Sequence, residues 1–360
     1  MENTLQKPQR KAWLDMAKGI AIIAVLVGHS FPGSMFINKF IFSFHMPLFF
    51  IAGGFTLSVA REPVDFITNK VKKLILPYMS FLMLSALWWI VRRPITGEKH
   101  TVEAIFNHLG KQYAAGLGAT NASVTWNTLA PIGPIWFIPC LFLAELVFYG
   151  VVKLCRDNDT AMFFVSVALM ISGVLIAKKT YLPFSFDISL FCQILLLVGY
   201  EMKKHDLLSK KISFEGWAAL IILWFVGIFV HVSMNNRQYN TVVLPVLCSV
   251  AAVFLIFRIC MALEKVTIIR APLSYYGRFS IILLLFQFWD KTVLRLPEFY
   301  PWLKLYQPHL KCYCALSLFR ILFCTLIIEI LRTIPYVCRC FGLELRKFAI
   351  FKKKQKKLDT

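Results

Sequence analysis

The chain has 360 residues, of which 58% are hydrophobic and only 16% are charged, and its mean hydropathy is +0.65. A soluble domain carries about 45–50% apolar and about 25% charged residues, so this composition excludes an ordinary soluble protein and predicts a polytopic membrane protein. The formal net charge of +21 would suit nucleic acid. The basic residues, however, stand in short clusters between apolar segments, which is typical of loops that flank membrane spans. We therefore expect no nucleic-acid partner.

Apolar segments recur along the whole chain, and each is near the roughly 17–25 residues that a membrane-spanning helix needs. The segments are 13–30, 40–60, 74–91, 135–152, 161–177, 184–200, 214–231, 242–261, 275–293 and 315–337. The expected fold class is therefore all-α, a polytopic membrane protein with about ten transmembrane helices. We expect one transmembrane domain over 1–345, with no separate soluble domain, followed by a basic cytoplasmic tail over 346–360.

The distribution of Lys and Arg predicts the orientation. If the N-terminus is inside, the inner segments hold roughly twice as many of these residues as the outer loops, which places both termini in the cytoplasm. The Lys-rich end of the chain is expected to lie against anionic lipid of the inner leaflet. We expect a multi-pass protein of the cell (inner or plasma) membrane. The first segment has the basic start of a signal peptide, but no Ala-x-Ala site follows it, so we expect an uncleaved helix.

The first apolar segment carries two ionisable residues, Lys18 and His29, eleven positions apart. At about 100° per residue both point from nearly the same face of a helix, roughly 16 Å apart along its axis. Ionisable groups inside a membrane are costly and are functional-site candidates. Imidazole titrates near neutral pH, so His29 is a candidate general base, and Lys18 is placed to bind an anion from the cytoplasm. Alternatively, Lys18 extends to the inner headgroups and His29 is a hydrogen-bonded helix end.

His45 stands at the start of the second segment, on the same expected side as His29. Two histidines at one depth can share a site. Gly53 and Gly54 follow in the same segment and would allow a neighbouring helix to approach closely. Alternatively, these glycines serve helix packing alone.

Three further residues carry charge or aromatic surface at expected membrane boundaries. Lys70 and Lys73 precede the third segment and share a helical face, where they can bind phosphates or simply anchor the segment on the inner side. Trp136 stands at the outer interface. Glu145 lies deeper in the same segment and needs a partner, either a histidine or a cation. The long polar loop over 92–133 is expected to be a lid, an acceptor platform or a passive connector.

The ten cysteines are scattered, and most stand inside apolar segments. No Cys-x-x-Cys is present, so we interpret them as small core residues and expect neither a metal site nor disulfides. Near the end of the chain Glu329 and Arg332 stand three positions apart and are expected to pair.

Four motifs in order resemble the acyltransferase-3 family of integral-membrane O-acyltransferases, and most closely its fucose 4-O-acetylase-like branch. They are Asp15-x-x-Lys18-Gly with Gly28-His29, Phe44-His-Met-Pro-Leu-Phe-Phe-x-x-Gly-Gly, Lys70-x-x-Lys73-x-x-x-Pro77-Tyr78, and Trp136-Phe-Ile. The resemblance covers mainly the first half of the chain. Lysines replace the more common arginines at 18, 70 and 73, so bidentate phosphate recognition is lost. Gly53 replaces the usual serine.

The resemblance implies that 1–345 is an acyltransferase-3-like transmembrane domain and that the protein is an O-acetyltransferase. The acyl donor would be cytoplasmic acetyl-CoA, and the acceptor a sugar hydroxyl of a cell-surface polysaccharide or its lipid-linked precursor. The implied catalytic residues are His29, His45 and Glu145. The residues implied to bind the CoA donor are Asp15, Lys18, Lys70, Lys73 and Trp136.

Two readings from other classes compete with this one. A transporter or flippase of a lipid-linked saccharide would also have many spans and buried charges. Such a protein is expected to show related halves with helices broken at matching positions, and the sequence shows none. A structural membrane partner without activity would tolerate the replacement of His29 by alanine.

Overall fold

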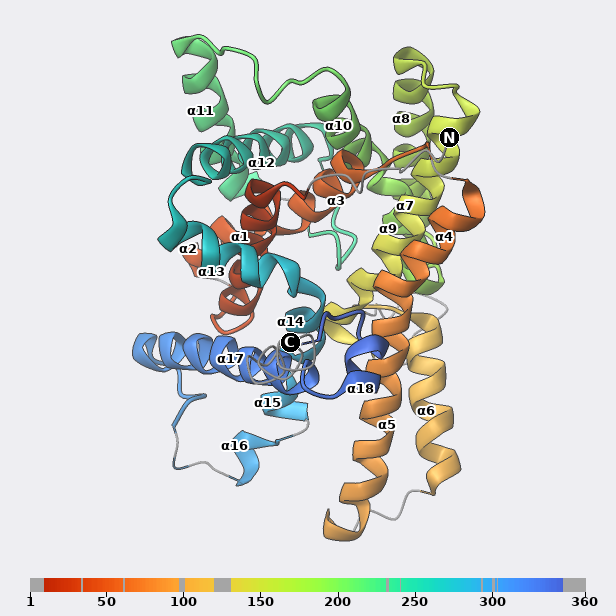
Figure 1. Ribbon diagram of the computed structural model, residues 1–360, viewed down its shortest axis with the longest axis vertical. Coiled ribbons are helices and arrows are strands. Elements are labelled where there is room, and N and C mark those ends of the chain that lie inside the picture. The colour runs from red at the N-terminus through yellow and green to blue at the C-terminus, as the bar shows by residue number, and fades with distance from the viewer. Residues whose placement is uncertain are drawn as a thin grey trace, which may run out of the picture. The chain divides into compact units, whose positions relative to one another are not determined.

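A computed structural model describes residues 10–33, 35–60, 62–96, 101–119, 131–230, 233–239, 241–292, 294–299, 302 and 304–345. Within these ranges every regular element is a helix, apart from one isolated β-bridge between Ser233 and Gln238 (Figure 1). The all-α fold class is thus confirmed. The basic tail predicted over 346–360 lies outside the described residues.

The chain divides into two compact units, each assembled from separate stretches of sequence. The first unit consists of the described parts of Met1–Val59, Leu143–Leu182 and Phe186–Ser280. The second consists of the described parts of Ala60–Phe142, Pro183–Ser185 and Ile281–Thr360.

The first unit contains the N-terminal helices and the middle of the chain. Its helices are α1 (Ala12–Gly28), α2 (Phe36–Phe42), α3 (His45–Thr56), α8 (Asp159–Ala177), α9 (Phe186–Phe191), α10 (Gln193–Lys204), α11 (Phe214–Val230), α12 (Val243–Leu263) and α13 (Thr267–Arg278). Helix α7 (Phe137–Leu154) begins in the second unit and ends in the first.

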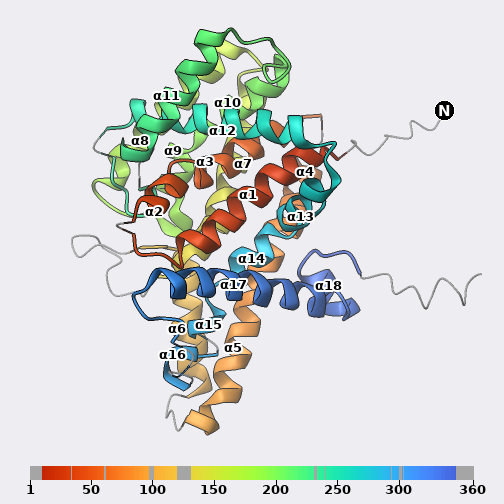
Figure 2. The ribbon, with the colours of Figure 1, turned by 90° about the vertical axis from the view of Figure 1, so that its left-hand side faces the viewer.

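The second unit contains the remaining helices. They are α4 (Pro63–Lys70), a π-helical turn (Val71–Ile75), α5 (Leu76–Thr96), α6 (Val102–Ala115), short 3-10 turns (Gly133–Trp136 and Pro183–Ser185), α14 (Ser280–Phe286), α15 (Trp289–Thr292), α16 (Leu296–Phe299), α17 (Leu310–Leu331) and α18 (Pro335–Cys340). Helices α5 and α6 run side by side (Figure 2).

Six helical stretches of the described chain are long and apolar enough to cross a membrane. They are Phe36–Thr56, Pro63–Arg92, Gly133–Leu154, Asp159–Ala177, Val243–Leu263 and Leu310–Leu331. Two bent pairs raise the number to eight if each pair is one span: Pro183–Phe191 with Gln193–Lys204 at 54°, and Thr267–Arg278 with Ser280–Lys291 at 62°. The expected ten spans are therefore not confirmed; α1 and α11, with 17 residues each, are not among these stretches. The cytoplasmic placement of the termini stays a prediction.

Glycines set the closest helix contacts of the first unit. A Cβ added to Gly19 of α1 would lie 2.0 Å from the carbonyl oxygen of Leu273 in α13, and one added to Gly277 of α13 would lie 1.8 Å from that of Asp15. The two helices therefore touch backbone to backbone (Figure 1). Small residues are what permits such an approach in a membrane, where apolar burial does not drive helices together.

A second crossing of the same kind joins α3 and α10. A Cβ on Gly54 would lie 1.9 Å from the Leu196 carbonyl oxygen, and one on Gly199 would lie 1.9 Å from that of Ile51. The expectation that the second apolar segment uses a glycine for close helix approach is therefore confirmed at Gly54.

The bend between α9 and α10 also coincides with a close contact. A Cβ on Gly173 of α8 would lie 2.5 Å from the carbonyl oxygen of Asp187 in α9. The break after Phe191 lets the short helix α9 lie against α8, whereas hydropathy predicted one segment over 184–200.

The segment expected to be a loop over 92–133 contains helix α6, which the sequence analysis missed. The Thr101 hydroxyl caps its start by accepting a hydrogen bond from the Ala104 N–H at 3.1 Å. Gly116 ends it with φ of +59°, a left-handed conformation that favours glycine. Gly116 is thus the C-cap of a helix inside the segment that was expected to be a loop.

Ion pairs hold several charged groups of the apolar helices. Asp187 accepts from Arg237 at 2.9 Å in the first unit, with both side chains at most 1% exposed. In the second unit Arg320 donates to Asp290 at 2.9 Å, and the expected pair of Glu329 and Arg332 is confirmed at 2.9 Å. A buried charge needs such a partner to be tolerated.

Candidate active site

Helix α1 carries both ionisable residues of the first apolar segment. Lys18 is half-buried inside the helix. His29 follows the helix directly as its C-cap, with φ of −80° and ψ of −7°, and its N–H donates to the Val25 carbonyl at 3.0 Å. Because the helix is continuous between the two positions, both side chains start from nearly one face, roughly 16 Å apart along the axis.

A buried asparagine of α2 holds the backbone on both sides of His29. Asn38 is only 2% exposed, and its Nδ2 donates to the carbonyls of Gly28 and Phe31 at 3.0 Å each. The last carbonyls of a helix have no partner within the helix, so a side chain from elsewhere must supply one. Asn38 does this and thereby ties the turn that carries His29 to a second helix. No sequence motif points to this asparagine.

His45 begins α3, and its protonation pattern is set by a backbone group. Its ring is 7% exposed, and Nδ1 lies 2.9 Å from the carbonyl oxygen of Ile41. A carbonyl oxygen only accepts, so Nδ1 carries the proton and Nε2 holds the lone pair in the neutral ring. The Phe42 ring packs against the imidazole at 5.0 Å between centroids. The ring is thus fixed with its basic nitrogen on the other side.

Glu145 lies in α7 against the bare backbone of α3. Its side chain is buried, and a Cβ added to Gly53 would lie 3.0 Å from its Oε1. Gly53 therefore makes room for the carboxylate. The serine that is usual at this position would bring a hydroxyl into contact with Glu145, so the departure at position 53 changes the surroundings of this acid.

Asp15 is occupied by two cations of its own unit. Its carboxylate binds the Arg10 guanidinium, and Arg278 of α13 lies 3.6 Å away. The aspartate is buried whereas the side chains of both arginines are more than half exposed. These contacts neutralise Asp15 and link the start of α1 to α13.

The other residues expected to bind the CoA donor lie in the second unit. Lys70 ends α4 and stands 5.5 Å from the Phe66 ring centroid, and Lys73 is exposed in the π-helical turn. This turn breaks the regular α-helical spacing on which their shared face was predicted, and such turns are frequent at functional sites. Trp136 is 4% exposed and stands edge-on to Phe137, close to the start of the candidate span Gly133–Leu154, and its expected place at the outer interface stays a prediction.

The structure thus separates the expected residues into two sets. The first unit holds Asp15, Lys18, His29, His45 and Glu145, and the second unit holds Lys70, Lys73 and Trp136. All three residues that were expected to be catalytic are therefore in one unit.

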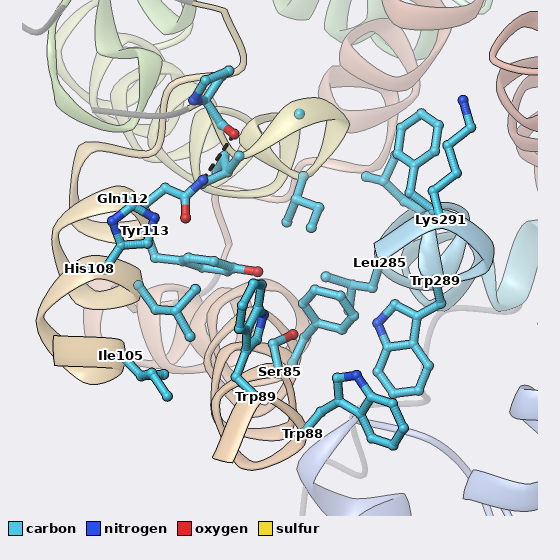
Figure 3. A pocket seen from close by; sticks show the side chains of 18 of the residues that line it. Ser85, Trp88, Trp89, Ile105, His108, Gln112, Tyr113, Leu285, Trp289 and Lys291 are labelled. Carbon is cyan, nitrogen blue, oxygen red and sulfur yellow. Dashed lines mark hydrogen bonds between the residues drawn. The ribbon is translucent and has the colours of Figure 1, made fainter. Parts of the chain in front are cut away.

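A cavity of about 740 Å³ lies within the second unit, between α5, α6 and α15 (Figure 3). Helix α5 lines it with Ser85 and Trp88, α6 with His108 and Gln112, and α15 with Trp289. No sequence motif identified these residues. The signal was present, because positions 105, 108, 109 and 112 of α6 all line the cavity and follow the spacing of one helical face.

One exposed cluster of the described chain has the side chains of a metal site. The ligand atoms of Asp159, Glu201 and His205 lie within 4.8 Å of one another. Asp159 already binds Lys204 and His205, and His205 also stands 3.0 Å from Glu201. Ion pairs within the chain thus account for these charges.

Comparison with known proteins gave one match. A family model described as an acyltransferase domain matches residues 11–329. Neither the curated proteins nor the solved structures contain a match. The matched segment includes every residue that the sequence analysis assigned to catalysis or to CoA binding.

Proposed function

The chain belongs to the acyltransferase family whose domain spans residues 11–329, and it is a membrane acyltransferase with an acyl donor and an acceptor; we propose that the donor is acetyl-CoA and the acceptor a sugar hydroxyl. The acceptor would belong to a cell-surface polysaccharide or its lipid-linked precursor, and the protein to the cell membrane. The fucose 4-O-acetylase-like branch is part of this proposal.

The observation that carries the mechanism is the fixed position of His29. A general base must stand within hydrogen-bond reach of the proton that it removes, and a misplacement of 1 Å can cost about 10²-fold in rate. The two hydrogen bonds from Asn38 hold the backbone on either side of the imidazole. His29 is only half-buried, so a substrate can reach it.

In the proposed reaction His29 removes the proton from the acceptor hydroxyl while that oxygen attacks the thioester carbon. The new C–O bond forms, the C–S bond of acetyl-CoA breaks, and the departing thiolate receives the proton from His29. The products are the O-acetylated sugar and free CoA. A covalent acetyl-imidazole on His29 would follow the same balance in two steps.

The surrounding residues have supporting roles in this proposal. His45, whose Nδ1 donates to the Ile41 carbonyl, would be a second histidine of the active site. Lys18 would bind a phosphate of CoA on the cytoplasmic side, and Lys70 and Lys73 would bind others as point charges. The distance of roughly 16 Å along α1 between Lys18 and His29 suits an extended pantetheine arm.

The test is transfer of label from radioactive acetyl-CoA in membranes that contain wild-type protein or the His29→Ala variant at matched levels. The proposal expects label in a saccharide fraction with the wild type only. Equal transfer by both would show that His29 is structural.

The two bent helix pairs favour the transporter alternative, because broken helices are typical of transporters. The same membranes therefore serve for a second measurement, the translocation of a lipid-linked saccharide. A difference in translocation without any acetyl transfer would favour the transporter.

A further inference from the structure

The cavity of the second unit presents hydrogen-bonding groups in fixed orientations. The Gln112 Nε2 donates to the Pro131 carbonyl at 3.0 Å, which leaves its Oε1 as an acceptor directed into the cavity (Figure 3). The Tyr113 hydroxyl also points into the space. Burial raises the pKa of Tyr113 to about 12, against a smaller opposing effect of Ser85, so this hydroxyl keeps its proton at neutral pH.

Two indole N–H groups of the cavity wall have no acceptor within the described part of the chain. They belong to Trp88 of α5 and Trp289 of α15, and both nitrogen atoms are buried. A buried donor that makes no hydrogen bond is destabilising. Because both nitrogen atoms are buried, these two residues line the cavity with their other atoms, which offer mainly apolar surface to a ligand.

Aromatic rings make up much of the remaining wall and are held in place. The Arg92 guanidinium lies 3.8 Å from the Trp89 ring centroid, and Phe286 packs edge-on against Trp289 at 4.5 Å. Flat rings fixed in this way offer stacking surfaces, and the few polar groups between them orient a ligand.

The chemistry of this wall discriminates between two kinds of occupant. An acyl or isoprenoid chain would fill the apolar space but leave the Gln112 amide oxygen without a donor. A pyranose ring presents C–H faces to aromatic rings and hydroxyl groups at its edge, where they both donate and accept. The volume of about 740 Å³ falls in the usual range for a small-molecule site.

We propose that this cavity is a saccharide-binding site that takes a neutral hexopyranose unit. Trp88 supplies a stacking face, and Gln112 accepts from a sugar hydroxyl. The role of this site rests on the proposed function: it would hold the acceptor sugar or the saccharide chain that continues from it. Saccharide binding itself does not depend on that function.

The experiment measures binding without any acyl donor. Full-length protein is placed in lipid nanodiscs, because glycoside detergents would compete. Saturation-transfer NMR is then recorded with the methyl glycosides of glucose, galactose, mannose and N-acetylglucosamine, and with decanoate as an apolar probe. The variants are Trp88→Leu, Trp88→Phe and Gln112→Leu, and the matched control is Trp302→Leu. Trp302 is 70% exposed and does not line the cavity.

We expect at least one methyl glycoside to bind, and Trp88→Leu and Gln112→Leu to weaken its affinity by about tenfold. Trp88→Phe keeps the stacking surface and should give a smaller loss. Trp302→Leu should bind as the wild type does. Each variant counts as folded if its elution volume in size-exclusion chromatography and its thermal unfolding match those of the wild type. If Trp88→Leu does not fold, the conservative Trp88→Phe variant takes its place.

The proposal is overturned if no glycoside binds, if folded variants of Trp88 and Gln112 bind as tightly as wild type, or if only decanoate binds. The His29→Ala variant separates this inference from the proposed function. If it binds the glycoside normally and no protein transfers acetyl groups to sugars, the saccharide site stands and the proposed function fails. If acetyl transfer is present but indifferent to Trp88, the proposed function stands and the site fails.

Discussion

The helices of the two units pack in opposite ways. In the first unit helices meet where no methyl group would fit, and a Cβ on Gly277 would lie 1.8 Å from the Asp15 carbonyl oxygen. In the second unit α5, α6 and α15 leave a cavity of about 740 Å³ with aromatic walls. Contact between backbones fixes atoms closely, as proton transfer requires, whereas a lined cavity accepts a ligand. In our proposals the first unit therefore carries the chemistry and the second unit binds the saccharide.

A large effect is expected at the crossing of α1 and α13. Gly277→Ala would place a methyl group against backbone atoms that cannot move away, and we expect it to lower the free energy of unfolding by about 3 kcal/mol or more. The matched control is Gly150→Ala, because a Cβ there meets nothing within 4 Å. Thermal unfolding in detergent measures both. Equal stability of the two variants would contradict the claim that backbone contact between α1 and α13 stabilises the first unit.

In the second unit the most sensitive point is the buried pair of Asp290 and Arg320. Arg320→Met leaves the carboxylate buried without its cation, and we expect a loss of about 3–5 kcal/mol. Asp290 also accepts from the Tyr306 hydroxyl at 2.6 Å, which cannot neutralise it. The double variant Arg320→Met with Asp290→Leu should recover most of the loss in the same unfolding assay. A double variant no more stable than the single one would show that the charge is not the cause.

Asn38→Leu tests whether the first unit positions its histidine. We expect kcat for acetyl transfer to fall by about 10²-fold, with KM for both substrates nearly unchanged, because the turn that carries His29 loses its two hydrogen bonds. The control is Asn158→Ala, which removes the N-cap of α8. That change should cost about 1 kcal/mol of stability and leave kcat intact. A drop in kcat that matches the loss of folded protein would remove the positioning role.

The smallest effect is expected at the exposed lysines of the π-helical turn. Lys73→Gln should raise KM for acetyl-CoA by about tenfold, since a charge-assisted contact to phosphate is lost. The effect should shrink at high salt, where exposed charges are screened. Lys72→Gln removes an equally exposed charge from the same turn and is the control. Equal effects of the two changes would indicate a general electrostatic attraction and no specific contact.

The sequence predicted the helices better than the spans. Each of the ten apolar segments is mostly helical over its described residues, because apolar runs of this length must satisfy their own backbone in a membrane. Hydropathy does not record where a helix bends, so the breaks after Phe191 and Arg278 were missed. Helix α6 was missed because its polar residues and Gly110 read as a loop, although Thr101 and Gly116 are capping signals.

The candidate site could be predicted only at residues whose type is rare in an apolar segment. A histidine beside an apolar helix stands out in any sequence, so His29 and His45 were identified without a structure. Asn38 and Gln112 did not stand out, because an amide becomes informative only when its partners are known. Tryptophans such as Trp88 are common at membrane boundaries, and only the cavity distinguishes this one from an interfacial anchor.

The central claim is that the first unit carries catalysis and the second unit binds the saccharide. It is tested most directly by steady-state kinetics of acetyl transfer from labelled acetyl-CoA to one saccharide acceptor. The measurement compares His29→Ala and Trp88→Leu with the wild type. We predict that His29→Ala lowers kcat by at least about 10²-fold with little change in the acceptor KM. Trp88→Leu should raise the acceptor KM by about tenfold and keep kcat. A Trp88 variant that loses kcat, or a His29 variant that keeps it, would contradict the account.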